Sequence, residues 1–516
     1  MKREFNTSEW FIWEQNASPM LLIMTLEPSF PYLRKYLGSC FFNSLIIFEP
    51  DEKGNYQGKW LFRHEEARVL GQKMVDMLMC TPYRNTFDKQ IELAKKNLIR
   101  KAQEIEFSAE IEKVDVQTLV NIFEDLYKVY CEYYKYAWFT ESLQWQSTHI
   151  LDKYLKENFK ENESEVLKAL LTTEYQSFGI DILEDLKSIK EGHLEEISSG
   201  NHSKELLAKC EEHSNKYYWK NNNYFSTKYI TLGDVLKELE ELGEIKIESG
   251  YDLLKQKAEI YSDLPAYYKG IVDLCNMAGI MGDTRKATIM TANSAFDKLL
   301  KAMAEKSDVS LEEIKMLIPQ ELKYFIESPE EYKERFELRK ERFMVAQSDF
   351  PLEDDLIEIP SNDEELESWT VSPMNEPFIV EGKEVENVIS ELDVRLNLLK
   401  HSVGERETLK GVATFYNKEQ PTISGVVRVI KDPKIEKLEE GEILVAPSTT
   451  PDYLDAMNKC KTIITDWGGQ TSHAAIVSRE MRKPCIIGTN FASRILKNGD
   501  EIKIDFEKGT IEIVEK

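Results

Sequence analysis

Apolar residues recur at helical spacing through much of the first 400 residues of this 516-residue chain. Between about residues 65 and 189 they fall three or four positions apart, which places them on one face of an α-helix. The same spacing predicts helices over 231–242 and about 251–304. Ser310 has the position of an N-cap and predicts one more helix start.

Short apolar runs bounded by turn residues predict β-strands near the N-terminus. The run 41–48 is followed by a turn at 51–54 and a second run at 58–62. This arrangement predicts a hairpin within a small β subdomain at residues 35–65. Residues 350–377 contain four prolines and many acidic side chains, which predict a loop. A last helix is predicted over 384–399.

The C-terminal segment alternates between strands and helices. We expect helices at 452–458 and 473–481, with Pro484 ending the second. The predicted strands are 425–430, 442–446, 462–465, 485–487, 501–505 and 510–514. The fold class is therefore multidomain, with a mainly α region and a small β element over residues 1–400, then an α/β domain over 408–516.

The charge distribution separates the same two regions. The formal charge is −26, but residues 401–516 carry 17 basic and 18 acidic residues and contribute almost none of it. The acidic field of the first 400 residues repels phosphate backbones and argues against nucleic acid as a partner. Acids within 353–367 follow no ligand spacing, so we expect a solvated loop there and no metal site. Seven scattered cysteines without C-x-x-C spacing predict neither a zinc site nor a disulfide framework.

The apolar runs also bear on localisation. None approaches the ~20 residues that a membrane span requires. The N-terminus lacks the continuous apolar segment of a signal peptide. We therefore expect a cytoplasmic protein with no membrane partner.

The strongest chemical signal is a histidine at a predicted helix start. The strand 462–465 leads into Gly468-Gly469, and then Thr471, Ser472 and His473 follow. Free backbone N–H groups and the helix dipole favour an anion at such a position. The glycines allow close backbone approach, and the hydroxyls can cap the helix and donate to phosphate oxygens. This arrangement suits a histidine that carries a phosphoryl group, although a lone histidine after two glycines is also an ordinary loop residue.

A wider set of residues resembles a known family. Residues 469–480 and 483–489, together with 441–447, Thr450-Pro451-Asp452 and Asn498-Gly499-Asp500, are similar to the swivelling phosphohistidine domain of the PEP-utilising enzymes, the group of phosphoenolpyruvate synthase and pyruvate phosphate dikinase. The resemblance implies a β/β/α swivelling fold over roughly residues 408–516. It implies further that the family's phosphorylated histidine is His473, its flanking hydroxyls are Thr471 and Ser472, and its helix arginine is Arg479. Lys459-Cys460-Lys461 departs from the family's alanine-glycine pair.

The resemblance also implies cofactors and partners. Enzymes of this group use an ATP-grasp domain to charge the histidine and a β/α barrel to handle pyruvate. We see neither in the first 400 residues or after the histidine domain, and the order of helical region and histidine domain looks closer to rifampin phosphotransferase without its ATP domain. Phenylphosphate synthase, whose ATP and histidine modules are on separate subunits, is a second analogy. We therefore expect ATP and Mg²⁺ to act through an ATP-grasp partner chain.

Several residues are candidates for binding a small-molecule acceptor. His213, Lys216 and Trp219 could line a pocket, but a packed helix end explains them equally simply. Arg339 and Arg342 follow Arg335 at helical spacing and could bind phosphate or carboxylate, or could form a solvated face paired with glutamates. The aromatic residues between Tyr127 and Trp145 could receive an aromatic substrate, although at helical spacing they more often form core.

These observations lead to one main hypothesis and two alternatives. The main hypothesis is a dikinase-like phosphotransferase component. In it, His473 receives a phosphoryl group from a separate ATP-grasp protein and passes it to an acceptor held by the helical region. One alternative is a phosphorylation-switched interaction protein without turnover of its own. The other is a subunit of the phosphoenolpyruvate synthase type, resembling pyruvate, water dikinase.

Overall fold

The computed structural model of the chain describes most of its length. The described residues are 10–16, 20, 43–50, 56–137, 139–159, 162–224, 227–242, 251–348, 378–382, 385, 408–417, 419–431, 433, 436–450, 453–466, 472–489 and 492–515. The predicted loop 350–377 and nearly all of the predicted helix 384–399 lie outside them. Two units can be distinguished, residues 1–147, 224–226 and 292–406 as unit 1, and residues 148–223, 227–291 and 407–516 as unit 2.

A five-stranded antiparallel sheet lies in unit 1, in the order β1-β3-β2-β4-β5. β2 and β3 pair as a hairpin, which confirms the predicted one. The other three strands were not predicted. β4 lies some 300 residues from its partner β2 in sequence, and β5 joins the sheet only by pairing with β4. The strands are β1 (Trp10–Asn16), β2 (Asn43–Pro50), β3 (Tyr56–Arg63), β4 (Phe343–Ser348) and β5 (Phe378–Glu381).

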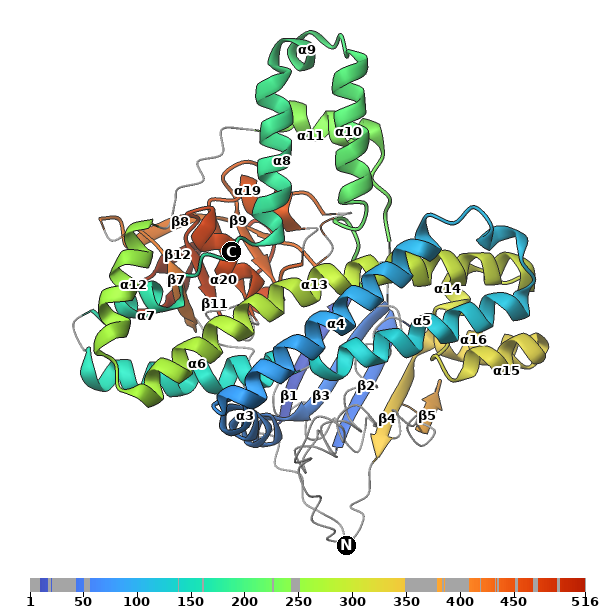
Figure 1. Cartoon of the computed structure of the whole chain (residues 1–516), viewed down its shortest axis with the longest axis horizontal. Coiled ribbons are helices and arrows are strands. Elements are labelled where there is room, and N and C mark those ends of the chain that lie inside the picture. Colours follow the sequence, from blue (N-terminus) through green and yellow to red (C-terminus); the bar gives the residue numbers. More distant parts are fainter. Residues whose placement is uncertain are drawn as a thin grey trace, which may run out of the picture. The chain divides into compact units, whose positions relative to one another are not determined.

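Helices make up most of the rest of unit 1, and α4 packs along α5 (Figure 1). The aromatic stretch on α5 forms core: Tyr130 is buried, stacks on Tyr134 and meets Phe296 edge to face. The helices are α3 (His64–Leu78), α4 (Thr81–Glu106), η2 (Ile111–Lys113), α5 (Val116–Ala137), α14 (Leu311–Ile314), α15 (Glu321–Glu327) and α16 (Pro329–Glu341), with parts of α6 (Phe139–Asn158) and α13 (Ala266–Ser307). Ser310 caps α14 in a capping box, which confirms that helix start.

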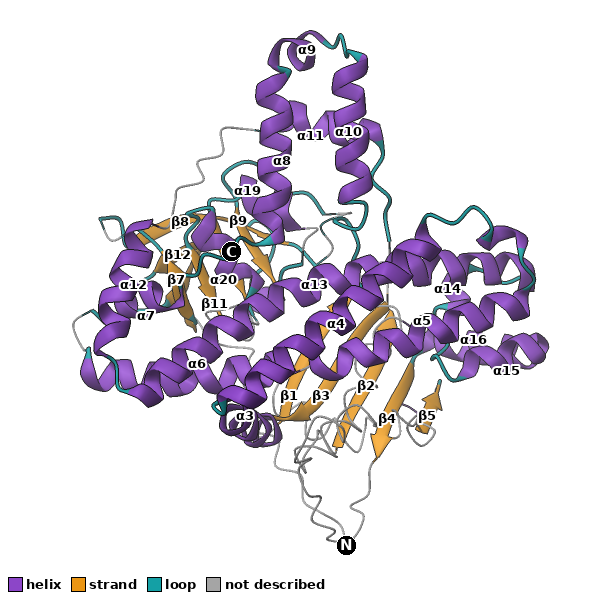
Figure 2. Ribbon diagram, viewed as in Figure 1, coloured by secondary structure: helices purple, strands orange, loops and turns teal. Residues whose placement is uncertain are grey.

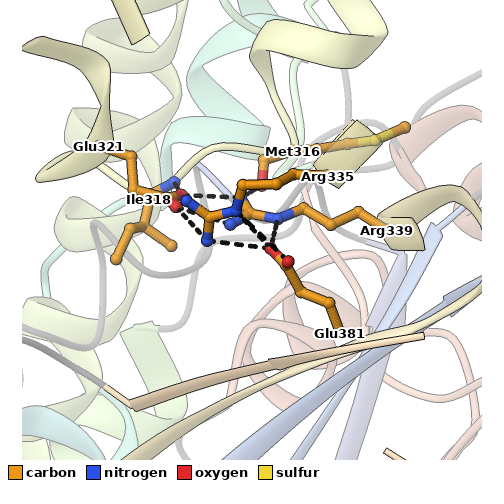
Figure 3. Close-up of polar contacts among 6 residues, drawn as sticks. All are labelled: Met316, Ile318, Glu321, Arg335, Arg339 and Glu381. Carbon is orange, nitrogen blue, oxygen red and sulfur yellow. Dashed lines mark hydrogen bonds and ion pairs between the residues drawn. The ribbon is translucent and has the colours of Figure 1, made fainter. Parts of the chain in front are cut away.

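A buried ion-pair cluster joins α15, α16 and β5 in unit 1 (Figure 3). The side chain of Arg339 is completely buried and bonds the two carboxylate oxygens of Glu321 at 2.6 and 2.7 Å. Its Nε donates to Glu381 at 2.6 Å, and its Nη1 also donates to the carbonyl of Met316 at 2.7 Å. Arg335 reaches the same two carboxylates from the next turn of α16. Each buried charge is therefore paired, as burial requires.

Unit 2 contains a helical hairpin in which α8 and α10 pack side by side, α9 lies at the tip and α11 packs against all three (Figure 1). The helical stretch predicted over 251–304 is two helices, because Pro265 lies between α12 and α13. The helices of this part are α7 (Glu163–Leu171), α8 (Phe178–Gly192), α9 (Leu194–Ser199), α10 (Lys204–Lys216), α11 (Leu232–Glu241) and α12 (Tyr251–Asp263), with the remaining parts of α6 and α13.

An eight-stranded mixed sheet, in the order β6-β13-β12-β8-β9-β10-β11-β7, completes unit 2 (Figure 2). β8, β9, β10 and β11 are parallel neighbours. All six predicted C-terminal strands and both predicted helices are present, and β6, β7 and α21 are additional. The elements are β6 (Thr408–Lys410), β7 (Val412–Phe415), β8 (Thr422–Val429), β9 (Ile443–Ala446), α19 (Leu454–Lys459), β10 (Thr462–Thr465), α20 (His473–Glu480), β11 (Cys485–Ile487), α21 (Ala492–Ile495), β12 (Glu501–Asp505) and β13 (Thr510–Glu515).

Alternate residues of the central strands enter two different cores. On β10, Ile464 joins a core with β12 and β13, whereas Ile463 joins a core with the helical hairpin. This alternation follows from the two-residue period of a strand buried on both faces. The second core contains residues of α8, α10 and α11 as well as α19 and α20. The helical hairpin and the C-terminal sheet therefore share one hydrophobic core, although the sequence predicts them as parts of separate domains, 1–400 and 408–516.

Within the described residues, no helix combines the length and the apolar character that crossing a membrane requires.

Replacing Arg339 with leucine is expected to destabilise unit 1 by about 3–5 kcal/mol, because Glu321 and Glu381 would lose their fully buried partner and keep only the partly exposed Arg335. Denaturant unfolding of the purified chain measures this change. Arg100→Leu is the matched control, since the ion pair of Arg100 with Glu104 is exposed and such pairs contribute about 0–1 kcal/mol. Equal losses in the free energy of unfolding for the two variants would show that the buried cluster stabilises the fold no more than an exposed ion pair does.

Candidate functional site

The histidine singled out by the sequence begins α20, beyond the carboxyl end of β10. Ser472 is the N-cap of this helix, and its hydroxyl accepts from the Ala475 N–H at 3.4 Å. At the end of β10, the buried Asp466 accepts from the hydroxyls of Thr489 at 2.8 Å and Ser493 at 2.5 Å. These bonds fix the point where the chain leaves the sheet. The connection 467–471, with Gly468, Gly469 and Thr471, lies outside the described residues.

The two ring nitrogens of His473 have different surroundings. Its Nδ1 lies 2.8 Å from the hydroxyl of Thr449, in the loop that follows β9. Its Nε2 is buried and has no hydrogen-bond partner among the described residues. The residue as a whole is only 3% exposed. The ring of Phe178, at the start of α8, stacks on the imidazole with centroids 5.6 Å apart and planes 17° apart.

The surroundings of His473 keep the ring neutral. Burial lowers the pKa of His473 well below its usual range, and the positive charge of Lys286 lowers it further. Lys286, on α13, donates to the carbonyl of Thr449 at 2.6 Å. A neutral imidazole has one protonated nitrogen. If that nitrogen is Nδ1, its N–H can donate a hydrogen bond to the hydroxyl oxygen of Thr449. We assign this tautomer from the hydrogen-bond network, and it leaves a lone pair on Nε2.

Two carboxylates, the buried Asp283 and the partly buried Glu480, connect the start of α8 to α13 and α20. Glu480, at the end of α20, accepts from the Ser177 hydroxyl and, at 3.3 Å, from the Ser177 N–H. Asp283, on α13, accepts from the Tyr175 hydroxyl at 2.7 Å and from the Phe178 N–H at 3.1 Å. Burial raises the pKa of Asp283 to about 6 and that of Glu480 to about 7.

The start of α8 also packs closely on the histidine domain. A Cβ added to Gly179 would lie 3.0 Å from Leu454 on α19 and 3.7 Å from Val477 on α20. Such a distance is at the limit of real contacts, so glycine allows α8 to approach this closely. Phe178 is therefore held over His473 by packing as well as by hydrogen bonds.

The predicted acceptor residues of α10 lie within the same unit. His213 is buried, with Nδ1 2.5 Å from Asp185 and Nε2 3.4 Å from Lys220, and burial lowers its pKa to about 4. Lys216 is largely exposed and lies over the Tyr217 ring. Trp219 meets Phe178 edge to face at 5.5 Å. Trp219 therefore contacts Phe178, the ring that stacks on His473. The contacts of His213 are those of a buried polar network.

The predicted arginines have different surroundings. Arg479 lies in the last turn of α20, where burial lowers its pKa to about 10. Arg339 belongs to the buried cluster of unit 1, so an acceptor could bind it only by displacing Glu321 or Glu381. Arg342 is the C-cap residue of α16, and its N–H donates to the carbonyl of Leu338. The acceptor-binding role assigned to Arg339 and Arg342 stays a prediction.

Sequence reasoning missed most of the residues around His473. Thr449 could have been found, because it follows predicted strand 442–446, and the carboxyl ends of neighbouring parallel strands lie at one edge of a sheet. Phe178 and Asp283 gave no such signal. They come from helices whose contacts with the histidine domain depend on tertiary packing.

Comparisons with known proteins find similarity in the part of the chain that contains His473. Residues 438–509 match the family model described as PEP-utilising enzyme, mobile domain. A probable phosphoenolpyruvate synthase of Archaeoglobus fulgidus is 49% identical over 89 residues, 17% of this chain and 12% of that protein. The phosphoenolpyruvate synthase of Deinococcus radiodurans is 33% identical over 165 residues, 30% of this chain and 21% of that protein. The matches thus span at most about a fifth of these relatives' length.

Among solved structures, the holo form of aconitase X from Thermococcus kodakaraensis is 23% identical in sequence to this chain over the aligned residues. The match covers 21% of this chain and 98% of that one, with a TM-score of 0.18. A TM-score this low extends neither the fold nor the function to the present chain.

His473 is expected to stay neutral, with its proton on Nδ1, from about pH 8 to pH 5, the range in which an ordinary histidine titrates. Nitrogen-15 NMR of histidine-labelled protein measures both the charge and the tautomer, with His473→Gln to assign the signal. Below about pH 6.5, His473 is protonated in the unfolded chain but stays neutral in the folded chain. The free energy of unfolding therefore decreases at His473 as the pH falls. A charged ring at pH 6, or a proton on Nε2, would contradict the assigned geometry.

Proposed function

We propose that this chain, whose residues 438–509 are a mobile domain of the PEP-utilising enzyme family, is the phosphoryl-carrier component of a dikinase-like phosphotransferase. His473 receives a phosphoryl group on Nε2 and passes it to an acceptor bound beside the helical elements of unit 2. The observation that carries the proposal is the state of the His473 ring. It is neutral, held through Nδ1 by Thr449, and has a buried Nε2 without a partner.

The proposed chemistry needs little more than this ring and its position. A lone pair on Nε2 is the nucleophile that a phosphoryl group requires, and a protonated imidazole would have none. The bond from Nδ1 to Thr449 fixes the ring and stabilises the charge that develops on it as phosphate binds. The backbone N–H groups at the start of α20 and the ammonium group of Lys286 favour the anion that results. Positioning and charge stabilisation of this kind are the main contributions to phosphoryl transfer.

We place the charging step on a separate ATP-grasp protein, which would supply ATP and Mg²⁺. His473 is covered by Phe178 in the arrangement described here, so the charging protein needs α20 to separate from α8. The same cover supports an acceptor position near α8 and α13, because these helices supply the side chains that pack on and around the imidazole.

The cover over His473 also favours a second candidate, the phosphorylation-switched interaction protein. A phosphoryl group on Nε2 would add negative charge beneath Phe178, whose N–H bonds the carboxylate of Asp283, and this would weaken the contact of α8 with α20. In that case phosphorylation would release the helical hairpin for a partner without turnover. Formation of a phosphorylated small-molecule product by the phosphorylated chain separates the carrier from the switch.

The proposal is tested with an ATP-grasp protein of the phosphoenolpyruvate synthase type, Mg²⁺ and ATP labelled in its β- and γ-phosphates. The chain is expected to acquire an acid-labile label that peptide mapping assigns to His473. His473→Ala should abolish the label, whereas His149→Ala, at an exposed position, should not change it. Phosphoramidate provides a donor that needs no protein partner. Label retained in full by His473→Ala with both donors would refute the carrier role.

The role of Thr449 is tested by a matched pair of substitutions. Thr449→Val keeps the shape but removes the hydroxyl that holds Nδ1, and should slow phosphorylation of His473 about tenfold, the weight of one hydrogen bond of 0.5–1.5 kcal/mol. Thr449→Ser keeps the hydroxyl and should stay close to the parent rate. Equal rates for the two variants would show that the Thr449 contact does not prepare the ring.

A further inference from the structure

We propose that Asp283 is the general base that takes the proton from the acceptor, and that the acceptor is a neutral compound with a hydroxyl group. This inference rests on the proposed carrier function and adds a catalytic residue and a substrate class to it. Asp283 lies outside the matched mobile-domain segment, and sequence analysis gave no indication of it.

The two carboxylate oxygens of Asp283 differ in their hydrogen bonds. Its Oδ2 accepts from the Tyr175 hydroxyl at 2.7 Å and from the Phe178 N–H at 3.1 Å. Its Oδ1 is buried and has no hydrogen-bond partner in the part of the chain that the structure describes. The residue is only 2% exposed. A buried carboxylate oxygen normally has a partner, and leaving it without one has a cost that a structural role does not explain. A ligand hydroxyl would supply the missing donor.

Three contacts connect Asp283 to the phosphoryl carrier through shared neighbours. Phe178 contacts both groups, since its N–H bonds Asp283 while its ring stacks on His473. Asp283 and Lys286 are three residues apart on α13 and so lie on neighbouring positions of one helix face. Lys286 in turn bonds the carbonyl of Thr449, whose hydroxyl holds His473. Two buried atoms without partners, Asp283 Oδ1 and His473 Nε2, therefore belong to one connected group of side chains.

The proposed step is balanced in atoms and charge. The acceptor oxygen attacks phosphorus as the bond from phosphorus to Nε2 breaks, and the electron pair of that bond returns to Nε2. The hydroxyl proton moves to Oδ1 of Asp283, and the phosphate ester leaves. The buried carboxylic acid then releases its proton to solvent when α8 and α20 separate. No oxidant, reductant or further co-reactant is needed.

The charges around Asp283 select the class of acceptor. Asp181 and Glu480 act on the same region, since Asp181 raises the pKa of Asp283 and Asp283 raises that of Glu480. Lys286 opposes the charge of Asp283, Arg479 opposes that of Glu480 and Lys216 that of Asp181. The ammonium group of Lys286 already bonds the carbonyl of Thr449. An anionic acceptor such as pyruvate would bring a further negative charge to this group, which like-charge repulsion disfavours. A neutral alcohol or phenol adds no charge and offers the hydroxyl that Oδ1 lacks.

The titration of Asp283 suits this role. Burial raises its pKa to about 6, the bonds from Tyr175 and Phe178 and the charge of Lys286 lower it, and Asp181 raises it. A general base is most effective when its pKa lies near the working pH, because it is then ionised yet still accepts a proton readily.

Water, the simplest neutral hydroxyl compound, makes the proposal testable without knowing the acceptor. The full chain is phosphorylated on His473, freed of donor, and the loss of phosphate is followed between pH 5 and 8. Asp283→Asn keeps the shape and can still accept from Tyr175 and Phe178, so the fold is retained. It should slow the loss of phosphate about 10²-fold, the lower end of general-base contributions. The difference between the parent and variant rates should rise with pH through about 6 and then level off.

A second variant separates a catalytic from a structural role. Tyr175→Phe removes a bond that lowers the pKa of Asp283, so the midpoint of the pH profile should move upward, which a merely structural contact would not cause. Unchanged hydrolysis in Asp283→Asn would overturn the assignment of the base. Phosphoryl transfer to added pyruvate in preference to water would overturn the acceptor class. Both results presuppose a phosphorylated His473, so failure of labelling would count against the carrier proposal alone.

Discussion

The site depends on one constraint, the burial of a neutral imidazole with a single hydrogen bond. A histidine that is 3% exposed would ordinarily have both ring nitrogens paired, because an unpaired buried polar atom costs about 1–3 kcal/mol. Here Nδ1 is paired with Thr449, and Nε2 has no partner within the described ranges. The unpaired Nε2 therefore places a cost on the fold that a ligand, or a covalently bound group, would remove. Such an arrangement is expected at a functional site rather than in an ordinary core.

The fold keeps this ring in place through a core shared by two kinds of structure. The parallel strands β9 and β10 present alternate residues to the helical hairpin, and α19 and α20 pack against the same hairpin residues. At the start of α8, Gly179 permits close approach, while Ser177 and Phe178 bond Glu480 and Asp283. The contact of α8 with the histidine domain is mainly apolar, and a few hydrogen bonds to Glu480 and Asp283 support it. Protonation of these carboxylates, or phosphorylation near them, would therefore change the strength of this contact.

How much the sequence could predict differed between local and long-range features. The six C-terminal strands and the helix at His473 followed from periodicity and turn residues, because each is decided within a few neighbouring positions. The hairpin of β2 and β3 was found for the same reason. β4 was missed because its partner β2 lies hundreds of residues away, and β5 because it joins the sheet only through β4. In the site, His473 and its cap Ser472 could be predicted, whereas Phe178, Asp283 and Lys286 reach it only through the packing of α8 and α13.

The central claim is that His473 carries phosphate on Nε2, and the ring nitrogen that bears the phosphate tests it most directly. The chain, labelled with nitrogen-15 in its histidine rings, is phosphorylated, and the nitrogen coupled to phosphorus is identified by NMR. The account predicts phosphate on Nε2 of His473, with the proton retained on Nδ1 beside Thr449. Phosphate on Nδ1, or on another histidine while His473 stays unmodified, would contradict it.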